Sequence, residues 1–356
     1  MAQNIKIEEI DRNFVTDKSF DISGLKLYNV LEKPFQVYGL ILPSEENKCF
    51  LRLPKEIADN TNPGVANLNY HTSGGRVRFR TNSSKIAIIA TLNHISRMSH
   101  FAFSGSAGFD LYINGEYENS FIPSKSVEDK FASLKRLDGG EMMEVQINFP
   151  QYAGVDELII GLDEGAALEE GRGYDYDLPI VYYGSSITQG ACATRPGNSF
   201  PAMIERETNC DYINLGFSGN GRCEPIIAEY IAGLDMQLFL MDDVYYVTPT
   251  AAELVEIHEP FFKKIREKNP NLPIIMTTSD NKIRDAEERR RVIKRTYDNA
   301  VASGDKNVYL VNTTEVMRSL AGGDGTVDGI HPNDLGFRGI ANGYGKIIKE
   351  VLEKGK

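Results

Sequence analysis

Three side chains in the C-terminal half of the sequence could together hydrolyse an ester. A serine hydroxyl attacks an acyl carbon when a histidine accepts its proton and a carboxylate holds that histidine in the right tautomer. Ser186 lies in the stretch Gly-Ser-Ser-Ile-Thr, and His331 ends the stretch Asp-Gly-Ile-His that Asp328 begins. In a turn before a helix, an aspartate and a histidine at this spacing can pair through Nδ1, which leaves Nε2 for the serine. These residues predict a serine nucleophile with a histidine base.

Each of the two stretches also has a plainer interpretation when it is taken alone. A Gly-Ser-Ser turn can simply cap a helix, and an Asp-x-x-His turn can do the same. Because both stretches occur in one domain, we favour catalysis, with Ser186 as nucleophile, His331 as base and Asp328 as the acid that orients it. The other histidines, which we expect to be surface or packing residues, are His71, His94, His100 and His258.

The rhythm of apolar residues from residue 178 onward predicts the elements that position these side chains. Short apolar runs alternate with helical patterns, which indicates a parallel sheet, because parallel neighbours need long right-handed crossovers. We therefore expect a doubly wound α/β domain whose ligands lie at the carboxyl ends of the strands, and Ser186 follows the first of these strands. The expected strands are 180–183, 212–217, 238–241, 274–278 and 308–311, and the expected helices are 200–207, 225–231, 251–268, 286–302 and 333–352.

The N-terminal half has a different rhythm, with alternating apolar residues in short runs between turn residues and no convincing helix. This pattern is typical of an antiparallel β-sandwich. The expected strands are 25–30, 35–42, 77–81, 86–92, 109–113, 145–149 and 158–162. We therefore predict a β domain over residues 1–165, a linker over 166–177 and a catalytic domain over 178–356.

The composition excludes several other classes of function. The 356 residues carry a formal charge of −11, which disfavours nucleic acid and anionic lipid surfaces as partners, because both bind clustered cations. No apolar stretch reaches the roughly 20 residues of a membrane span, and no signal-peptide pattern opens the sequence. We expect a soluble protein, periplasmic or secreted if a signal segment was removed and cytoplasmic otherwise. The oligomeric state stays open.

The cysteines do not predict a metal centre. There are four, with no Cys-x-x-Cys pair, and they are too few for a disulfide framework in a chain of this length. Cys192 and Cys223 fall in loops at the same predicted rim, so a bridge between them stays open. We expect neither a metal nor an organic cofactor, because a serine, a histidine and an aspartate suffice for acyl transfer.

The combination of these stretches resembles the SGNH/GDSL hydrolase superfamily, and the resemblance covers residues 178–353. The hallmarks of that superfamily are Gly-x-Ser-x-Thr in a first block, a glycine in a second, an asparagine in a third and Asp-x-x-His in a fifth. The resemblance implies a flavodoxin-like domain with Ser186, His331 and Asp328 as the triad. Ser185 stands where the commonest pattern has aspartate.

The same resemblance implies an oxyanion hole and shows where this sequence departs from the family. Gly219 matches the second-block glycine, so its N–H and that of Ser186 would hold the oxyanion. The third-block asparagine is missing from the loop after residue 241, where Tyr246 stands nearest to its expected place. Asn220 or a tyrosine hydroxyl could replace it. A lost oxyanion donor costs about 3 kcal/mol in the transition state, or roughly 10²- to 10³-fold in rate.

The stretch Gly108-Phe109-Asp110-Leu111-Tyr112 resembles the Gly-x-Asp-Leu-Tyr motif of a β domain that precedes some SGNH hydrolases. This second resemblance implies a jelly-roll-like partner domain and looks closest to carbohydrate esterases. We therefore expect hydrolysis of short acyl esters, most of all acetyl esters on a carbohydrate. A lipase-like or thioesterase activity and glycan binding without catalysis are the alternatives. The residues expected to bind substrate are Arg195, Asn198, Arg222, Tyr245 and Tyr246.

Overall fold

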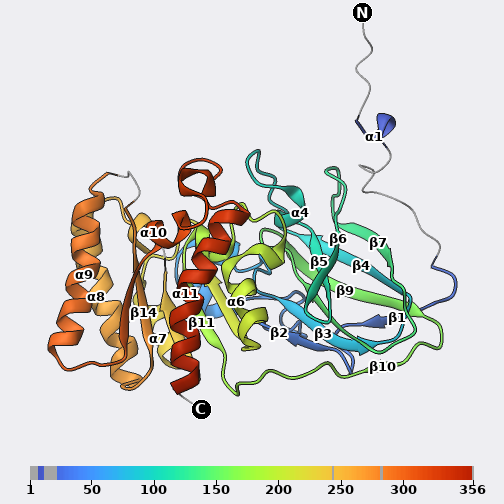
Figure 1. Ribbon diagram of the computed structural model, residues 1–356, viewed down its shortest axis with the longest axis horizontal. Helices are drawn as coiled ribbons and strands as arrows, with labels where there is room; N and C mark the ends of the chain where they lie inside the picture. The colour runs from blue at the N-terminus through green and yellow to red at the C-terminus, as the bar shows by residue number, and fades with distance from the viewer. Residues whose placement is uncertain (1–6, 12–21, 243, 281–283, 355–356) are drawn as a thin grey trace, which may run out of the picture.

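The protein consists of a β-rich N-terminal part and an α/β C-terminal part that pack side by side (Figure 1). The computed structural model describes residues 7–11, 22–242, 244–280 and 284–354. The first residues of the predicted β domain, 1–6 and 12–21, therefore lie outside the described residues. Within the described residues, no helix is both long enough and apolar enough to cross a membrane.

The N-terminal part contains two sheets in which every pairing is antiparallel, as the alternating apolar pattern predicts. Apolar side chains from both sheets form one core, which includes Phe79, Ile88 and Ile160. The first sheet runs β1 (Leu25–Asn29), β9 (Gly154–Asp163), β4 (Lys85–Asn93), β7 (Lys130–Arg136). The second runs β10 (Leu168–Glu169), β3 (Arg76–Thr81), β8 (Met143–Asn148), β5 (Phe109–Ile113), β6 (Glu116–Phe121), with β2 (Gln36–Tyr38) also on β3.

Several local features of this part differ from the sequence-based expectation. The predicted linker is partly structured, because Leu168–Glu169 pairs with β3 as strand β10. Strands β6 and β7 were not expected, since they are rich in polar residues and partly exposed. The expectation of no helix was also wrong: α2 (Lys55–Asp59), α3 (Pro63–Leu68) and α4 (Phe103–Ser106) are present. Each is too short to show a helical period in sequence.

The C-terminal part is built on a five-stranded parallel sheet, which confirms the predicted α/β domain. Its order is β12 (Tyr212–Gly216), β11 (Ile180–Gly184), β13 (Leu238–Met241), β14 (Ile274–Thr278), β15 (Val308–Asn312). This is the 2-1-3-4-5 order of flavodoxin-like folds, in which the chain winds outward from β11 in both directions. The switch point between β11 and β13 is where a ligand site is expected.

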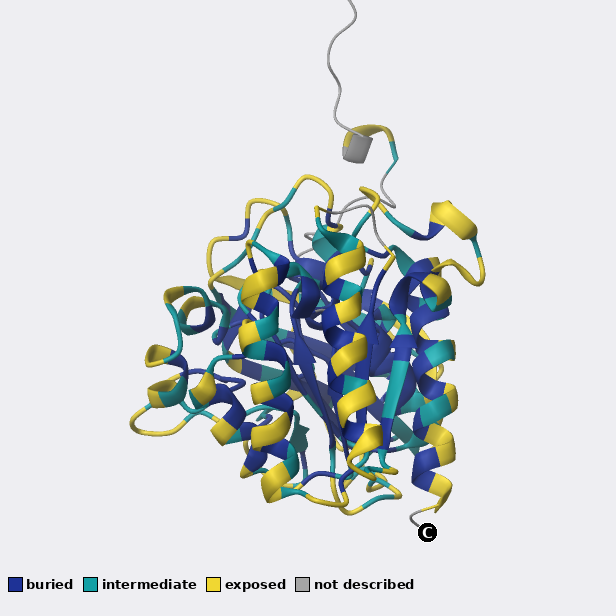
Figure 2. Ribbon diagram, turned by 90° about the vertical axis from the view of Figure 1, so that its left-hand side faces the viewer, coloured by how far each residue is buried: buried dark blue, intermediate teal, exposed yellow. Residues whose placement is uncertain are grey.

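Helices cover both faces of this sheet, so its strands are buried while the outer faces of the helices are exposed (Figure 2). Val181 and Tyr183 of β11 pack with α7, α8 and α9, whereas Ile180 and Tyr182 pack with α6 and α11. Two-sided burial explains why the strands read as continuous apolar runs. The helices are α6 (Phe200–Thr208), α7 (Pro225–Ala232), α8 (Ala251–Lys268), α9 (Ala286–Ala302), α10 (Thr313–Arg318) and α11 (Asp334–Lys354), and the short elements are α1 (Ile7–Ile10), α5 (Ser186–Gln189), η2 (Pro196–Asn198), η3 (Val244–Tyr246) and η4 (Gly322–Gly325).

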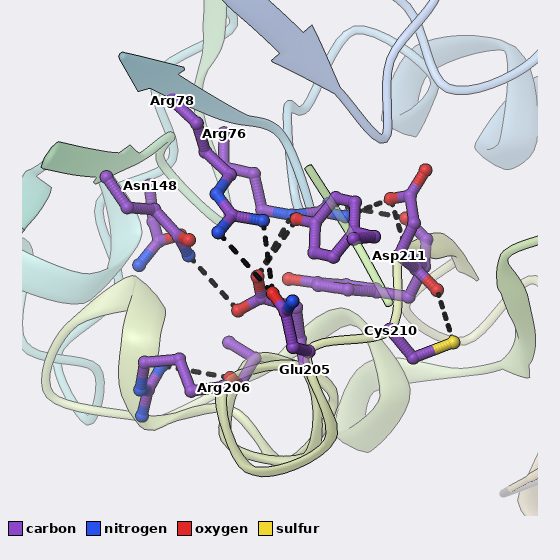
Figure 3. A network of polar contacts seen from close by, with 12 residues as sticks. Arg76, Arg78, Asn148, Glu205, Arg206, Cys210 and Asp211 are labelled. Carbon is purple, nitrogen blue, oxygen red and sulfur yellow. Dashed lines mark hydrogen bonds and ion pairs between the residues drawn. The ribbon is translucent and has the colours of Figure 1, made fainter. Parts of the chain in front are cut away.

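A polar network centred on Arg76 of β3 joins the two parts (Figure 3). Arg76 forms an ion pair with Asp211, the residue before β12, and its Nε donates to the hydroxyl of Tyr174 at 2.7 Å. That hydroxyl donates to Glu205 of α6 at 2.9 Å. The side chains of Arg76 and Glu205 are 0% and 2% exposed. Since an unpaired buried charge is costly, this network holds the β part in one orientation on the α/β part.

Candidate active site

Ser186 begins α5 directly after β11, at the carboxyl edge of the parallel sheet. The turn is tight: a Cβ atom at Gly184 would lie 2.1 Å from Thr188 Oγ1 and 2.4 Å from the Asp242 carbonyl oxygen. Only glycine therefore fits at this position. Asp242, which is fully buried after β13, accepts hydrogen bonds from Thr188 Oγ1 and Thr277 Oγ1, each at 2.9 Å. Asp242 thus anchors the serine turn, residues 184–188, to the neighbouring strands of the sheet. The sequence alone did not suggest this role.

His331 and Asp328 lie in the turn before α11, and the structure brings both to Ser186. His331 Nε2 is 3.1 Å from Ser186 Oγ, and His331 Nδ1 is 2.7 Å from Asp328 Oδ2. Asp328 Oδ1 also accepts the backbone N–H groups of Ile330 at 3.0 Å and His331 at 2.8 Å. Burial acts to raise the pKa of Asp328, but the hydrogen bonds from His331 and from these N–H groups outweigh it and lower the pKa to about 2.

These contacts fix the direction of each hydrogen bond. An ionised Asp328 carboxylate can only accept, so the proton of neutral His331 lies on Nδ1 and its Nε2 is an acceptor. The Ser186 hydroxyl then donates to Nε2. This arrangement can remove the proton from Ser186 as its oxygen attacks an electrophile.

The oxyanion side of the site is less complete. The backbone N–H of Ser186 donates to no other residue in the described part of the chain. The N–H of Gly219, however, donates to Ser185 Oγ at 2.8 Å. Gly219 is exposed, has φ +67°, and leaves open space where a Cβ would stand. Its N–H can therefore reach an oxyanion only when the bond to Ser185 is broken or shared.

The Asn220 side chain, which the sequence suggested as an oxyanion donor, contacts other parts of the chain in this structure. Its Nδ2 donates to the Ser218 carbonyl at 2.8 Å. Its side chain also packs against α3 of the β part, where a Cβ at Gly64 would approach the Asn220 amide to 2.2 Å. Tyr246 contacts the ring of Tyr245 at a centroid distance of 4.3 Å and packs against the apolar cores on the two faces of the sheet.

Most of the residues expected to bind substrate have structural contacts instead. Arg195 pairs with Asp110 at 3.2 Å, donates to the Tyr112 hydroxyl and lies over the ring of Tyr117 at 3.7 Å. Tyr245 is 2% exposed within the core. Asn198 ends η2, and its Nδ2 donates to Thr194 Oγ1 at 3.4 Å.

Arg222 is the exception, because it is exposed next to Gly219, whose carbonyl accepts its Nε–H at 3.3 Å. Of the residues expected to bind substrate, Arg222 therefore has the most exposed charged group beside the site.

The Gly-x-Asp-Leu-Tyr stretch has a clear role at the interface between the two parts. Asp110 is fully buried and accepts from Arg195, from the Gly197 N–H at 2.8 Å and from Asn148 Nδ2 at 2.8 Å. Tyr112 receives a second bond from Arg195. The motif therefore anchors the segment that leads from the serine turn into α6, rather than acting only as the entrance of a strand.

His100 and Cys192, which the sequence did not predict to be site residues, lie beside His331. The rings of His100 and His331 have a centroid distance of 5.9 Å. Ligand atoms of His100, Cys192 and His331 lie within 4.8 Å of one another, a grouping that could hold a metal ion. All four cysteines are free, so Cys192 and Cys223 do not form a bridge in this structure. No sequence signal could have paired His100 with His331, because they come from different domains.

Comparisons with known proteins cover both parts of the chain. Residues 177–349 match the GDSL-like lipase/acylhydrolase family, and residues 25–168 match the GxDLY family, described as the N-terminus of an SGNH-hydrolase-type esterase. These matches confirm the resemblance seen in the motifs. No functionally curated protein matches the chain in sequence.

Solved structures with the same arrangement of both parts are also similar. A candidate GDSL-like lipase from Bacteroides ovatus is 27% identical with a TM-score of 0.81, and the match covers 92% of this chain and 98% of that one. A salicylyl-acyltransferase from a tetracycline biosynthetic pathway is 19% identical with a TM-score of 0.75, over 92% and 98%. An acetyl xylan esterase from Butyrivibrio proteoclasticus is 12% identical with a TM-score of 0.59, over 93% and 99%. The last two likenesses show a shared fold.

Proposed function

Because its C-terminal domain belongs to the GDSL-like lipase/acylhydrolase family of SGNH-type hydrolases, we propose that this protein is a serine esterase that hydrolyses short acyl esters through Ser186, His331 and Asp328. The observation that carries the proposal is the 3.1 Å contact between Ser186 Oγ and His331 Nε2. A hydroxyl at hydrogen-bond distance from a neutral imidazole, which is in turn held by a carboxylate, is the arrangement that activates a serine.

The reaction follows from the direction of these bonds. His331 Nε2 takes the Ser186 proton as Oγ attacks the acyl carbon, and Asp328 stabilises the imidazolium that forms. The imidazolium then gives the proton to the departing alkoxide, which leaves an acyl-Ser186 ester. Water attacks this ester with His331 again as base, which releases the acid and restores the serine.

The oxyanion would be held by backbone N–H groups. The Ser186 N–H is available without rearrangement, and the Gly219 N–H joins it when Ser185 Oγ gives up its 2.8 Å bond. We expect a slower enzyme than one with three free donors, because each donor contributes roughly 10²- to 10³-fold to the rate.

We further propose acetyl groups on a carbohydrate as the substrate. The loop that carries His100 lines a hollow of about 530 Å³ in which Arg97, Ser99, His100 and Lys125 stand beside the apolar Met98, Phe101 and Phe103. Exposed Arg222 lies near Gly219. Charged and polar side chains can bond sugar hydroxyls better than they can solvate a long acyl chain. A fold shared with an acetyl xylan esterase is consistent with this substrate class.

The test is the release of p-nitrophenol from acetate, butyrate and octanoate esters, followed by acetate release from acetylated xylan. We expect acetate to be the best ester and expect Ser186→Ala to lower kcat by roughly 10⁴-fold or more. Ser104→Ala is the matched control. The Ser104 hydroxyl donates to the Thr194 carbonyl at 2.6 Å and takes no part in the proposed reaction.

Other outcomes would identify the alternatives. Rates that rise with acyl length would favour a lipase-like or thioesterase activity. Wild-type protein without turnover on any ester, together with glycan binding that survives in Ser186→Ala, would instead indicate a glycan-binding protein and overturn the esterase proposal.

A further inference from the structure

Three metal-binding side chains meet at the mouth of the proposed active site. His100 comes from the loop before α4 in the β domain, Cys192 from the turn after α5, and His331 from the turn before α11. In Figure 1, α4 and the loop before α11 lie at the same edge of the molecule. The ligand atoms of all three residues lie within 4.8 Å of one another.

The ligand types fit zinc, and the distances fit it once the His100 side chain rotates inward. Zinc–nitrogen bonds of about 2.0–2.1 Å and zinc–sulfur bonds of about 2.3 Å in tetrahedral geometry place ligand atoms roughly 3.3–3.8 Å apart. His100 is exposed, so its side chain can rotate to close the remaining gap. Two imidazoles and a thiolate form a ligand set that binds borderline-soft cations and leaves a fourth position for water.

The hydrogen bond between Asp328 and His331 also favours a zinc site. His331 Nδ1 is bonded to Asp328 Oδ2 at 2.7 Å, so Nε2 is the nitrogen that faces a ligand. A carboxylate on the far nitrogen of a ligating histidine is the usual support of a zinc site, because it fixes the tautomer and raises the basicity of the ligand. The same Asp328 that would prepare His331 for catalysis would therefore also prepare it for a metal.

Cys192 is held in place by the serine turn. It has φ 74°, a left-handed conformation that is uncommon for a non-glycine residue, and it is 3% exposed. The preceding Ala191 donates its N–H to the Ser186 carbonyl at 2.9 Å. A cysteine binds zinc as the thiolate, so an incoming zinc ion would displace the proton of the Cys192 thiol to solvent.

We propose that His100, Cys192 and His331 form a binding site for Zn²⁺ and that zinc bound there inhibits the enzyme. Zinc on His331 Nε2 occupies the atom that must accept the proton of Ser186, so the nucleophile is no longer activated. The inhibition rests on the proposed esterase function, whereas the binding site does not. The β domain would thereby supply, through His100, one ligand of a switch on the catalytic domain.

Binding is tested on the full-length protein without substrate. Metal-stripped protein is titrated with Zn²⁺ by calorimetry and with Co²⁺ by absorption, since a thiolate ligand gives a charge-transfer band that imidazoles alone do not. We expect one ion per chain, and we expect His100→Ala and Cys192→Ser each to weaken zinc binding by about tenfold or more, with the thiolate band absent in Cys192→Ser.

Two variants serve as matched controls. Cys223→Ser alters a second free, buried cysteine with positive φ, 57°, and His94→Ala removes a histidine that stacks on Tyr70 at 4.2 Å. Both should bind zinc like the wild-type protein. Zinc affinity that is unchanged in His100→Ala and Cys192→Ser, or the absence of any thiolate band in the wild-type protein, would overturn the site.

Inhibition is then measured as the ratio of each variant's rate with and without Zn²⁺. We expect zinc to inhibit the wild-type esterase, a chelator to restore it, and His100→Ala to need about tenfold more zinc for the same inhibition. Zinc that binds at the three residues without lowering the rate would overturn the inhibitory role. A protein that binds zinc but hydrolyses no ester before zinc is added would instead count against the esterase proposal and leave the site intact.

Discussion

The nucleophile side and the anion side of the candidate site are built to different degrees of completion. On the nucleophile side, Ser186, His331 and Asp328 are already joined by bonds of 3.1 and 2.7 Å. On the anion side, the Gly219 N–H is engaged by Ser185 Oγ, and the Asn220 amide is engaged by the Ser218 carbonyl. In the proposed mechanism, proton transfer is therefore prepared in the free protein, whereas the second oxyanion donor, the Gly219 N–H, must first be released from Ser185.

The first prediction concerns the nucleophile side and has the largest expected effect. Asp328→Asn should lower kcat on p-nitrophenyl acetate by roughly 10⁴-fold, because an amide can donate to His331 and stabilise the wrong tautomer. Thermal unfolding should change little, since the Asp328 side chain is 37% exposed. Asp324→Asn in the neighbouring η4 is the control. A loss of less than tenfold would show that Asp328 does not orient the base.

The second prediction contrasts two arginines that the sequence placed in one substrate-binding group. Arg195→Ala should lower the free energy of unfolding by about 3 kcal/mol, because it leaves the fully buried carboxylate of Asp110 without its cation. Urea unfolding measures this loss.

The double variant Asp110→Asn/Arg195→Ala should lose less free energy of unfolding than the sum of the losses of the two single variants, since both substitutions remove the same interaction. Additive losses, or normal stability with a raised KM in Arg195→Ala, would return Arg195 to the substrate cleft.

Much of the fold could be predicted because periodicity reports burial directly. The boundaries of α8, α9, β13 and β14 agree with the pattern to the residue, since each of these elements has an apolar run or face that ends in polar or turn residues. Short elements could not be predicted. One example is α3, which depends on a cap in which the Val65 N–H donates to Asn62 Oδ1 at 2.9 Å. One cap and one turn are too little sequence to show a period.

The site divides in the same way. The Ser186 turn and the Asp328–His331 turn are each recognisable from a few neighbouring residues. Because both lie in the α/β domain, the sequence indicated that Ser186 and His331 could meet. The contacts of Arg195 and the proximity of His100 to His331 depend on how the β domain docks, and no pattern within one segment encodes that. The bond between Gly219 and Ser185 depends on a single side-chain rotamer. Motifs therefore do not predict a contact that a second domain or a side-chain rotamer decides.

The third prediction tests whether the anion side is held back by Ser185. Ser185→Ala removes the acceptor of the Gly219 N–H, and a neutral hydrogen bond contributes about 0.5–1.5 kcal/mol. We therefore expect kcat on p-nitrophenyl acetate to rise by up to about tenfold, with KM little changed. Ser199→Ala is the matched control, because Ser199 is buried and, among the residues that the structure describes, its hydroxyl donates only to the Pro196 carbonyl, at 3.0 Å.

A fall in kcat in Ser185→Ala would reverse this interpretation. It would mean that the Ser185 hydroxyl, polarised by the Gly219 N–H, itself donates to the oxyanion and replaces the missing third-block asparagine. Ser185→Thr, which keeps the hydroxyl, should then restore the rate.

The last prediction has the smallest effect and concerns the one member of the expected substrate group that stays exposed beside the anion side. Arg222→Ala should change the free energy of unfolding by less than about 0.5 kcal/mol, because the side chain is exposed and its bond within the described structure is a 3.3 Å contact with the Gly219 carbonyl. If Arg222 binds sugar hydroxyls, KM for acetylated xylan should rise several-fold while p-nitrophenyl acetate, which has no sugar, reports an unchanged rate. Equal changes on both substrates would show that Arg222 acts on the oxyanion loop and not on the glycan, which would place it on the anion side of the site.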